Sequence, residues 1–354
     1  QNFHIGTYCL QKNARTEEHI KALSECGIDF VIGIDHDVKA LDLFYKYGVS
    51  VALSGLFPGW FGGNGAEAGN MHIKNPENTY INAARHFVDH PAIALIDIGD
   101  EPSSLDFPYY GKIVDMLTEH FPQKLLYLNI YPSYGMLADS GKLQAEAELG
   151  TTTYQEYLRI YCQNIDLPYI SFDHYVYSSN TEVFLSDLSN VALCCKEYGK
   201  KLMIVLQVNS KEKESPLSIA QLRFQAFCAL SFGASSITWA CYSAGWWYNN
   251  VLDSEGNKTE QYEKLKKVNA EIRELCTEYM NYTWVENSFL DKEHICSFGD
   301  FFEISSSVCA TVGLFQNNDD GAGMFYNPLN QEEEKAVICF KYLGSNQLCC
   351  RTTT

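Results

Sequence analysis

The sequence predicts a (β/α)8 barrel that is followed by a small β-rich accessory domain. Short apolar runs alternate with amphipathic helical segments through about residue 280, and eight strand-then-helix units can be traced. The runs are almost continuously apolar, as expected for parallel strands whose two faces are both buried. Alternation of this kind favours a parallel sheet with helical crossovers, and eight units of this length favour a closed barrel over an open doubly wound sheet.

Each barrel strand is predicted from an apolar run, and each helix from an apolar period of 3.6 residues. The strands are predicted at residues 3–9, 30–34, 51–57, 92–98, 125–130, 169–172, 202–208 and 236–241. The helices are predicted at residues 17–26, 38–47, 80–88, 109–120, 154–164, 183–198, 219–232 and 261–279. Thr16 is the predicted N-cap of the first helix, and Gly27 and Gly199 are predicted helix stops. The Gly-x-Gly-x-x-Gly turn of a dinucleotide-binding sheet does not follow the first strand.

After about residue 281 short strand-like segments replace the alternation of strands and helices, and we predict a domain boundary there. The catalytic barrel is expected to occupy residues 1–280, and the accessory domain residues 281–354. Short strands are predicted in the accessory domain at residues 283–289, 294–297, 301–305, 309–315, 323–327 and 336–342. The turn-rich segment 316–321 separates two of these strands.

The composition limits the kinds of partner that the chain can have. The 354 residues include 26 Lys and Arg against 44 Asp and Glu, which gives a formal net charge of −18. This excess argues against nucleic acid or an anionic membrane as the main partner, because both would be repelled. Hydrophobic residues make up 46% of the chain, enough for a large core. No apolar stretch approaches the ~18–20 residues that cross a bilayer.

The 13 cysteines are an odd number and show no metal-ligand spacing. The pairs Cys194-Cys195 and Cys349-Cys350 are adjacent in sequence and therefore unsuited to an ordinary disulfide or a zinc clip. We expect free thiols, and hence the cytoplasm or another reducing setting. Secretion or attachment at the cell surface stays open, because a removed signal peptide would leave no trace. No cofactor and no metal are expected.

Chemistry is expected at the carboxyl ends of the barrel strands, where the active sites of this fold lie. The fourth strand ends in the sequence Asp100-Glu101-Pro102. A carboxyl group at the edge of an apolar barrel can keep its proton and act as a general acid, and a neighbouring carboxylate strengthens that effect. Glu101 is therefore the predicted general acid, and Asp100 is a further catalytic candidate. Acidic capping of the following helix is the alternative explanation for both.

Asp173, at the end of the sixth strand, is the predicted second catalytic carboxylate. Strand alternation places Ser171, Asp173 and Tyr175 on one face, which we expect to point into the same mouth as Glu101. His174 has the opposite parity and is expected to be structural. An Asp that bonds only to a loop backbone is the alternative.

The remaining strand ends and loops carry amide and aromatic side chains, which suit sugar hydroxyls and the C–H faces of sugar rings. The predicted substrate-binding residues are Asn129, Tyr175, Gln207, Asn209, Trp239, Tyr242, Trp60, Trp246 and Trp247. Buried amides that tie neighbouring strands together are an equal alternative for Gln207 and Asn209. The glycine-rich segment 58–70 contains Trp60 and is predicted to be a lid or cleft wall.

With Glu101 at the end of its fourth strand, the segment 3–280 resembles the retaining glycoside hydrolases of the large barrel clan. In that clan the acid/base Glu often stands in Asn-Glu-Pro, and here Asp100 replaces the Asn. The resemblance also implies a sugar-stacking role for Trp239. The clan's nucleophile is a Glu at the end of strand seven, where this chain has Gln207 and Asn209 but no carboxylate. Asp173 is the nearest candidate for that role.

The adjacent acids also resemble those of substrate-assisted hexosaminidases. In these enzymes a Glu protonates the leaving oxygen, while an Asp orients the 2-acetamido group that acts as nucleophile. The resemblance implies these roles for Glu101 and Asp100, with Tyr175 or Tyr177 as the accompanying hydroxyl. The chitinase pattern Asp-x-Asp-x-Glu fits only in part, since Gly99 occupies its middle position.

The sequence therefore predicts a glycoside hydrolase that acts on an oligo- or polysaccharide by carboxylate acid/base catalysis. Substrate-assisted catalysis is one alternative. A carbohydrate-binding barrel that has lost catalysis is another, because the strand-seven Glu is missing. A metal-dependent barrel hydrolase is a third, and it would use the clustered Asp35, His36 and Asp37 as ligands.

Overall fold

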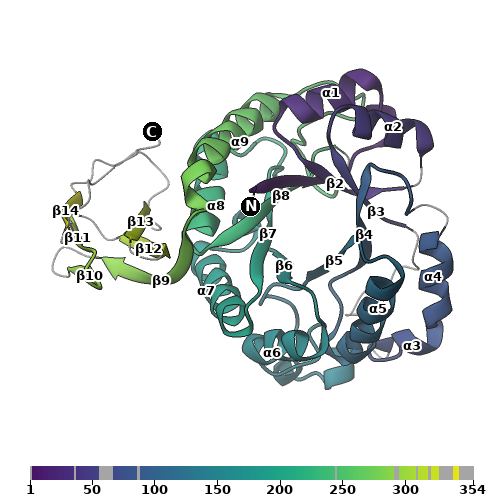
Figure 1. Ribbon diagram of the computed structural model, residues 1–354, viewed down its shortest axis with the longest axis horizontal. Helices are drawn as coiled ribbons and strands as arrows, with labels where there is room; N and C mark the ends of the chain where they lie inside the picture. The colour runs from purple at the N-terminus through teal and green to yellow at the C-terminus, as the bar shows by residue number, and fades with distance from the viewer. Residues whose placement is uncertain are drawn as a thin grey trace.

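The computed structural model describes residues 2–35, 37–55, 67–85, 88–243, 245–290, 295–307, 310–317, 320–326 and 338–342. Eight strands form a closed barrel in the order β1-β2-β3-β4-β5-β6-β7-β8. Neighbouring strands are parallel, and the pairing of β1 with β8 closes the ring. Figure 1 shows the ring of strands with the helices packed around its outside. The predicted (β/α)8 barrel is confirmed.

The barrel elements follow the predicted order, with ends that differ by a few residues. The strands are β1 (His4–Tyr8), β2 (Phe30–Ile34), β3 (Ser50–Leu53), β4 (Ile93–Asp100), β5 (Leu125–Ile130), β6 (Tyr169–Asp173), β7 (Lys201–Gln207) and β8 (Ala234–Ala240). The helices are α1 (Glu17–Glu25), α2 (Val38–Lys46), α3 (Met71–Lys74), α4 (Glu77–Arg85), α5 (Phe107–His120), α6 (Tyr154–Asn164), α7 (Thr181–Tyr198), α8 (Ile219–Ser231) and α9 (Glu260–Tyr279). The short helix α3 was not predicted.

Local signals explain where several helices begin and end. The Thr16 side chain accepts a hydrogen bond from the backbone N–H of His19, as predicted for the N-cap of α1. Ser218 and Gln221 form a reciprocal capping box at the start of α8. Gly199 ends α7 with a φ of 65°, a left-handed conformation that costs glycine little.

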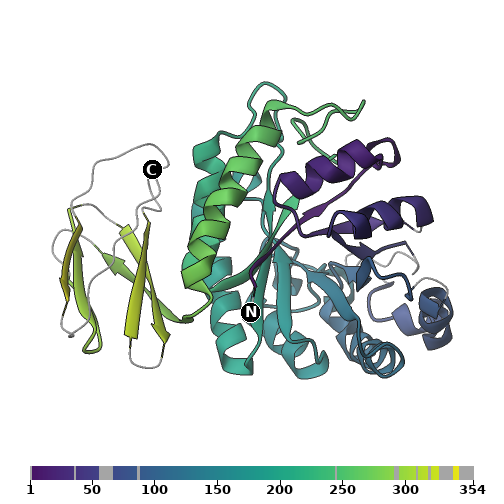
Figure 2. The ribbon, with the colours of Figure 1, turned by 45° about the horizontal axis from the view of Figure 1, so that its top comes forward.

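Two small antiparallel sheets follow α9. One has the order β10-β11-β14 and the other the order β13-β12-β9. The strands are β9 (Thr283–Leu290), β10 (Cys296–Phe298), β11 (Phe302–Ser306), β12 (Ala310–Asn317), β13 (Asp320–Tyr326) and β14 (Ile338–Tyr342). Leu290, Phe302, Ile304, Val312 and Leu314 form part of a hydrophobic core of their own between the sheets. Figures 1 and 2 place both sheets outside the ring of strands, with β12 and β13 nearer to α8 and with β10, β11 and β14 farther out.

Close packing joins the β13-β12-β9 sheet to the barrel. A Cβ atom on Gly313 of β12 would lie 2.1 Å from the carbonyl oxygen of Ser231, so only glycine fits against the end of α8. The rings of Tyr279 and Phe315 also meet, with centroids 5.5 Å apart. The β13-β12-β9 sheet therefore packs directly against the helical layer.

Two cysteines on neighbouring helices lie close together. Cys162 on α6 and Cys194 on α7 have sulfur atoms 3.6 Å apart. The cysteines whose side chains the structure describes form no disulfide with one another. Within the same part of the chain, no helix is both long and apolar enough to span a membrane.

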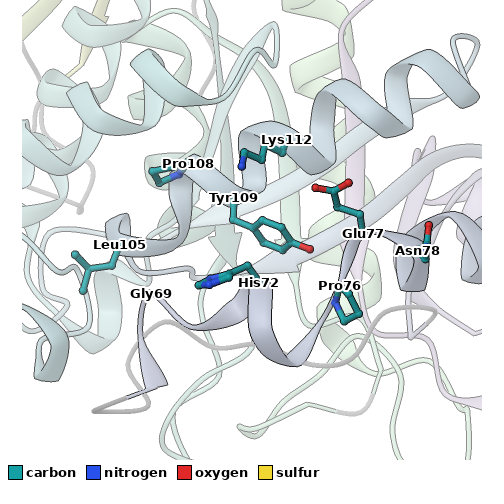
Figure 3. Close-up of a pocket in the computed structure, with 9 residues that line it drawn as sticks. All are labelled: Gly69, His72, Pro76, Glu77, Asn78, Leu105, Pro108, Tyr109 and Lys112. Atoms are coloured by element: carbon teal, nitrogen blue, oxygen red, sulfur yellow. The ribbon is translucent and has the colours of Figure 1, made fainter.

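Two cavities lie away from the carboxyl ends of the barrel strands. One of about 640 Å³ lies outside the barrel, where α3, α4 and α5 meet, and Figure 3 shows the side chains of His72, Glu77 and Tyr109 around it. The other, of about 390 Å³, lies at the amino ends of the strands and is lined in part by Leu95 and Met203. Neither is lined by a predicted site residue.

Candidate active site

A β-bulge in β4 turns two aspartates to the same side of the strand. Where β4 pairs with β5, Asp97 lies opposite Tyr127 and Asp100 lies opposite Asn129, with a register shift after Asp97. Residues three apart in a regular strand point to opposite faces, so the extra residue brings both carboxyl groups inside the barrel. Gly99 points outward, since a Cβ atom there would lie 2.5 Å from the Tyr110 hydroxyl on α5.

Glu101 follows directly and has an unusual backbone conformation. Its φ is 45°, in the left-handed region that is rare for residues other than glycine. Its backbone N–H donates to the carbonyl oxygen of Asn129 at 2.9 Å, which anchors the residue to the end of β5. Its partly exposed carboxyl group donates a hydrogen bond to the carboxylate of Asp173. A strained backbone held by such contacts is a common feature of functional sites.

Asn129 connects the carboxylates of two strands. Its Nδ2 atom donates to Asp173 Oδ1 at 2.7 Å and to Asp100 Oδ1 at 3.2 Å. Asp173 is only 5% exposed and Asn129 only 3%, so both bonds lie in a setting of low dielectric constant. The three predicted catalytic residues are thus brought together, as the strand ends indicated. Asn129 lies with them, although its amide is bonded to the acids and not directed to solvent.

Burial and mutual repulsion keep protons on this cluster at neutral pH. Burial, together with the charges of Asp173 and Asp100, raises the pKa of Glu101 to about 10. Burial also raises the pKa of Asp173 to about 7, although the hydrogen bonds from Asn129 and Glu101 oppose the rise. The pKa of Asp100 is raised to about 6, again by burial. Glu101 therefore holds the proton, and Asp173 is the group that accepts its hydrogen bond.

Asp97 is a half-buried acid that the prediction did not include among the site residues. Its Oδ2 atom accepts from Ser54 Oγ at 2.7 Å, and its Oδ1 atom accepts from the backbone N–H of Gly99 at 3.3 Å. Burial raises its pKa to about 7, and the neighbouring Asp100 contributes to the rise. Alternation along a regular strand places Asp97 and Asp100 on opposite faces. A bulge between them, which Gly99 makes possible, would have indicated that both face the barrel interior.

Tyr134, after β5, was also missed. Burial raises the pKa of its hydroxyl, and the charges of Asp173 and Glu101 add to the rise, which places the residue near both acids. The residue is 48% exposed, so it lies at the open side of the carboxylate cluster. The only signal for it in the sequence is its place in the loop that follows the fifth strand.

Three predicted aromatic residues form a cluster next to the acids. The Tyr175 ring meets those of Trp246 and Trp247 edge to face, with centroids 6.1 and 5.0 Å away. The two indole rings are 6.2 Å apart, and Trp246 is 53% exposed. The charges of Asp173 and Asp100 reach the Tyr175 hydroxyl and raise its pKa beyond the effect of burial. A cluster of rings, of which that of Trp246 is exposed, therefore lies beside the carboxylates. Trp60 lies outside the described residues.

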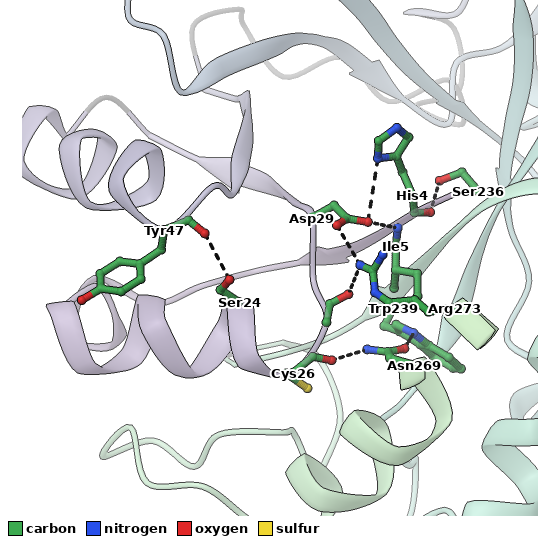
Figure 4. Close-up of polar contacts among 11 residues, drawn as sticks. His4, Ile5, Ser24, Cys26, Asp29, Tyr47, Ser236, Trp239, Asn269 and Arg273 are labelled. Carbon is green, nitrogen blue, oxygen red and sulfur yellow. Dashed lines mark hydrogen bonds and ion pairs between the residues drawn. The ribbon is translucent and has the colours of Figure 1, made fainter. Parts of the chain in front are cut away.

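Trp239 and Tyr242 do not belong to the site, so these two predictions are wrong. Both are fully buried. The indole N–H of Trp239 donates to Asn269 Oδ1 on α9 at 2.9 Å, on the outer side of the barrel wall (Figure 4). Tyr242 lies close to Cys26 and Tyr262, which pack behind the same wall. Residues that face the helices are as apolar as those that face inward, because both layers are dry.

The amides at the end of β7 tie structural elements together. Gln207 is fully buried, and its Oε1 atom accepts from the backbone N–H of Tyr177 at 3.2 Å. Asn209 is also fully buried and donates to Asn250 Oδ1 at 3.2 Å. Each amide thus ties two segments together, while Gln207 Nε2 and Asn209 Oδ1 have no hydrogen-bond partner in the described part of the chain. The hydroxyl of Tyr177 donates to the carbonyl of Gln221 on α8, so Tyr177 is not the accompanying hydroxyl.

His174 fixes the loop after β6, as its parity suggested. Its Nδ1 atom lies 2.8 Å from Asp187 Oδ2 on α7, and both side chains are fully buried. Its Nε2 atom lies 2.8 Å from Ser179 Oγ. Asp187 also accepts the backbone N–H of Ser133 at 3.1 Å. The buried pair thus joins the loops that carry Tyr134 and Tyr175.

The possible metal ligands after β2 have other partners. Asp35 forms ion pairs with Arg15 and with Lys12, the latter at 3.0 Å. Asp37 is the N-cap of α2 and accepts the backbone N–H of Ala40 at 3.3 Å. His36 lies outside the described residues. Among the residues that are described, no group of three His, Cys, Asp or Glu side chains is arranged to hold a metal ion.

Known proteins resemble this chain in fold and hardly at all in sequence. No protein-family model matches the chain, and no curated protein matches it. Xylanase 10B from Thermotoga maritima superposes with a TM-score of 0.51 and 14% identity over 77% of this chain and 97% of its own. The β-galactosidase from Marinomonas ef1 gives 0.57 and 12% over 79% of this chain and 62% of its own.

A third structure, the endo-β-1,4-mannanase from Thermotoga petrophila, gives a TM-score of 0.52 and 9% identity over 92% of this chain and 97% of its own. At these identities the likeness shows the fold alone. The chain therefore shares its barrel with structures of several glycoside hydrolases that differ in substrate.

Proposed function

We propose that this chain is a glycoside hydrolase in which Glu101 is the general acid and Asp173 is its carboxylate partner. The observation that carries the proposal is the convergence of Glu101, Asp100 and Asp173 at the carboxyl ends of two barrel strands, where Asn129 bonds both aspartates. Glu101 and Asp173 also act on each other's pKa. A protonated acid beside an ionised carboxylate is the arrangement that cleavage of a glycosidic bond needs. The fold that the chain shares with a xylanase, a β-galactosidase and a mannanase supports the same reading.

We infer retention of configuration, because the carboxyl groups of Glu101 and Asp173 act strongly on each other. Inverting enzymes keep their carboxyl groups about 6.5–9.5 Å apart to admit a water molecule, whereas retaining enzymes keep them about 5–5.5 Å apart. Asp173 then replaces the Glu that barrel hydrolases carry on strand seven, where this chain has the buried Gln207.

The two half-reactions balance with these residues alone. In the first, Glu101 gives its proton to the glycosidic oxygen as the bond to C1 breaks, and an Asp173 oxygen forms a bond to C1. In the second, water attacks C1 and gives a proton back to Glu101, while the Asp173 oxygen leaves. Asn129 stabilises Asp173 in its ionised form, because its amide donates to that carboxylate at 2.7 Å.

Substrate-assisted hydrolysis of a 2-acetamido sugar is the second candidate. It is favoured by one observation, the inward position of Asp100 directly beside Glu101. In that case Asp100 would orient the acetamido group, and Asp173 would act on Glu101 only through its charge. Loss of Asp173 would then reduce turnover less than loss of Asp100.

The barrel without catalysis is less well supported, because Glu101 has a carboxylate companion that acts on it directly.

A panel of 4-nitrophenyl glycosides, together with xylan, mannan and galactan, tests the proposal on the whole chain. We expect release of nitrophenol or reducing sugar from at least one member, and loss of it in Glu101→Gln and Asp173→Asn. The exposed Glu146→Gln variant is the matched control and should retain activity. Equal activity in all of these variants would refute the assignment.

A further inference from the structure

A chain of hydrogen bonds crosses the inside of the barrel and ends at the carboxylates. The hydroxyl oxygens of Tyr8 on β1 and Tyr127 on β5 lie 3.0 Å apart, and Tyr127 lies 3.0 Å from Ser171 Oγ on β6. Ser171 Oγ lies 3.1 Å from Asn129 Oδ1, and the amide nitrogen of Asn129 reaches Asp173 at 2.7 Å. Because β1 and β5 lie on opposite sides of the eight-stranded ring, the chain spans the barrel interior.

The end of this chain fixes the direction of every bond in it. Carboxylate oxygens only accept hydrogen bonds, so the Asn129 side chain presents its NH2 group to the two aspartates and its oxygen to Ser171. Ser171 has one hydroxyl proton, which it gives to Asn129, and it must therefore accept from Tyr127. Tyr127 in turn accepts from Tyr8. All of the donors point toward the acids.

The residues of this hydrogen-bond chain from Tyr127 onward are buried, so the common direction of their bonds affects the acids at its end. Tyr127 is fully buried, Ser171 is 1% exposed and Asn129 is 3% exposed. Donors in series polarise one another, and the effect is strongest where no water competes. The last donor, Asn129, acts on both aspartates, where its bonds lower the pKa against the effect of burial. Removal of a hydroxyl group from Tyr127 or Ser171 should therefore change the pKa of the carboxylates that Asn129 binds.

We propose that Tyr127 and Ser171 are positioning residues that lock and polarise the Asn129 amide, which in turn holds Asp100 and Asp173 in place for the reaction. The role in turnover rests on the proposed function, whereas the hydrogen-bond chain can be tested without any substrate. Both residues are buried beneath the carboxylates, so they act through Asn129 and not by contact with a sugar.

Two variants break the chain and one serves as a matched control. Ser171→Ala and Tyr127→Phe each remove a hydroxyl group from the chain without adding volume. Tyr161→Phe removes another buried hydroxyl, which donates to the carbonyl oxygen of Tyr169 at 3.2 Å and has no link to Asn129. All three changes carry a similar cost in packing, so stability alone does not separate them.

The first readout is the titration of Asp173, followed by carbon-13 NMR of the whole chain labelled at its aspartate carboxyl carbons. We expect Ser171→Ala and Tyr127→Phe to raise the pKa of Asp173 by roughly half a unit to one unit, the equivalent of one weakened hydrogen bond. The acid limb of kcat/KM on a cleaved 4-nitrophenyl glycoside should move to higher pH by the same amount. Tyr161→Phe should change neither.

An unchanged Asp173 titration in both chain variants would overturn the proposal, whatever their activity. An equal shift in all three variants would also overturn it, because the cause would then be general loosening of the barrel. If the titration moves only in the chain variants but the unaltered protein cleaves no glycoside, the positioning role stands and the proposed hydrolysis fails.

Discussion

At the scale of single residues, Glu101 is the group on which the chemistry depends. Its carboxyl group is partly exposed at the carboxyl end of β4, has its pKa raised to about 10 by burial and by Asp173 and Asp100, and shares its proton with Asp173. A free glutamate would lose that proton near its ordinary value of 4.5. The site therefore stores a proton at neutral pH where a leaving group can use it.

Glu101→Gln should reduce turnover by about 10²–10⁴-fold on substrates whose leaving group needs a proton. The loss should be much smaller for a dinitrophenyl glycoside, because that leaving group departs without protonation. Steady-state kinetics on a series of aryl glycosides measures the difference. An equal loss across the series would show that Glu101 is not the acid.

The same group should make folding stability fall as pH rises. A carboxyl group whose pKa is higher in the folded chain stabilises it fully below about 4.5, and that contribution is lost as pH rises toward about 10. Glu101→Gln should therefore melt at a higher temperature than the unaltered chain at pH 8, and at a similar temperature at pH 4.5. Thermal unfolding at the two pH values tests this. A lower melting temperature for the variant at pH 8 would contradict the raised pKa.

Residue identity predicted the acids better than the aromatic residues. Glu101 and Asp173 could be found because a charged group that directly follows an apolar barrel strand is expected at the open end of the barrel, where the active site lies. Trp239 could not be assigned in the same way, because the outer face of a barrel strand is as apolar as its inner face. The Trp239 indole is bound by Asn269 on α9. In the sequence, such a Trp cannot be told from one that stacks on a sugar.

At the scale of elements, the bulge in β4 determines which acids face inward. Alternation alone would put Asp97 and Asp100 on opposite faces, and the sequence contains no direct sign of the register shift after Asp97. Gly99 is the nearest signal, since a glycine inside a strand often marks a bulge or a close approach. The strands and helices themselves could be predicted because apolar runs, caps and stops agree along the barrel.

Gly99→Ala should destabilise the chain by about 1–3 kcal/mol, because its Cβ atom would meet the buried Tyr110 hydroxyl at 2.5 Å. Adding Tyr110→Phe removes that hydroxyl, which has no hydrogen-bond partner in the described part of the chain. The double variant should therefore recover part of the loss. Urea unfolding of both variants gives the comparison, and a fully stable Gly99→Ala would contradict the geometry of the bulge.

At the scale of the whole molecule, the net charge of −18 bears on the choice of substrate. A polyuronate should bind more weakly than a neutral polysaccharide with the same linkage, because it approaches a surface of its own charge. The gap in KM should narrow with added salt, since the screening length falls from about 30 Å at 0.01 M to about 8 Å at 0.15 M. Matched kinetics at the two salt levels measure it. Tighter binding of the polyuronate at low salt would contradict the expectation.

The most direct measurement of the central claim is the protonation state of Glu101 itself. Carbon-13 NMR of the chain labelled at its glutamate carboxyl carbons, with Glu101→Gln to assign the signal, follows that group across the pH range. We predict a signal that still has the shift of a protonated acid at pH 7 and moves toward carboxylate only near pH 10. A Glu101 signal that titrates near pH 4.5, as a free glutamate does, would contradict the account.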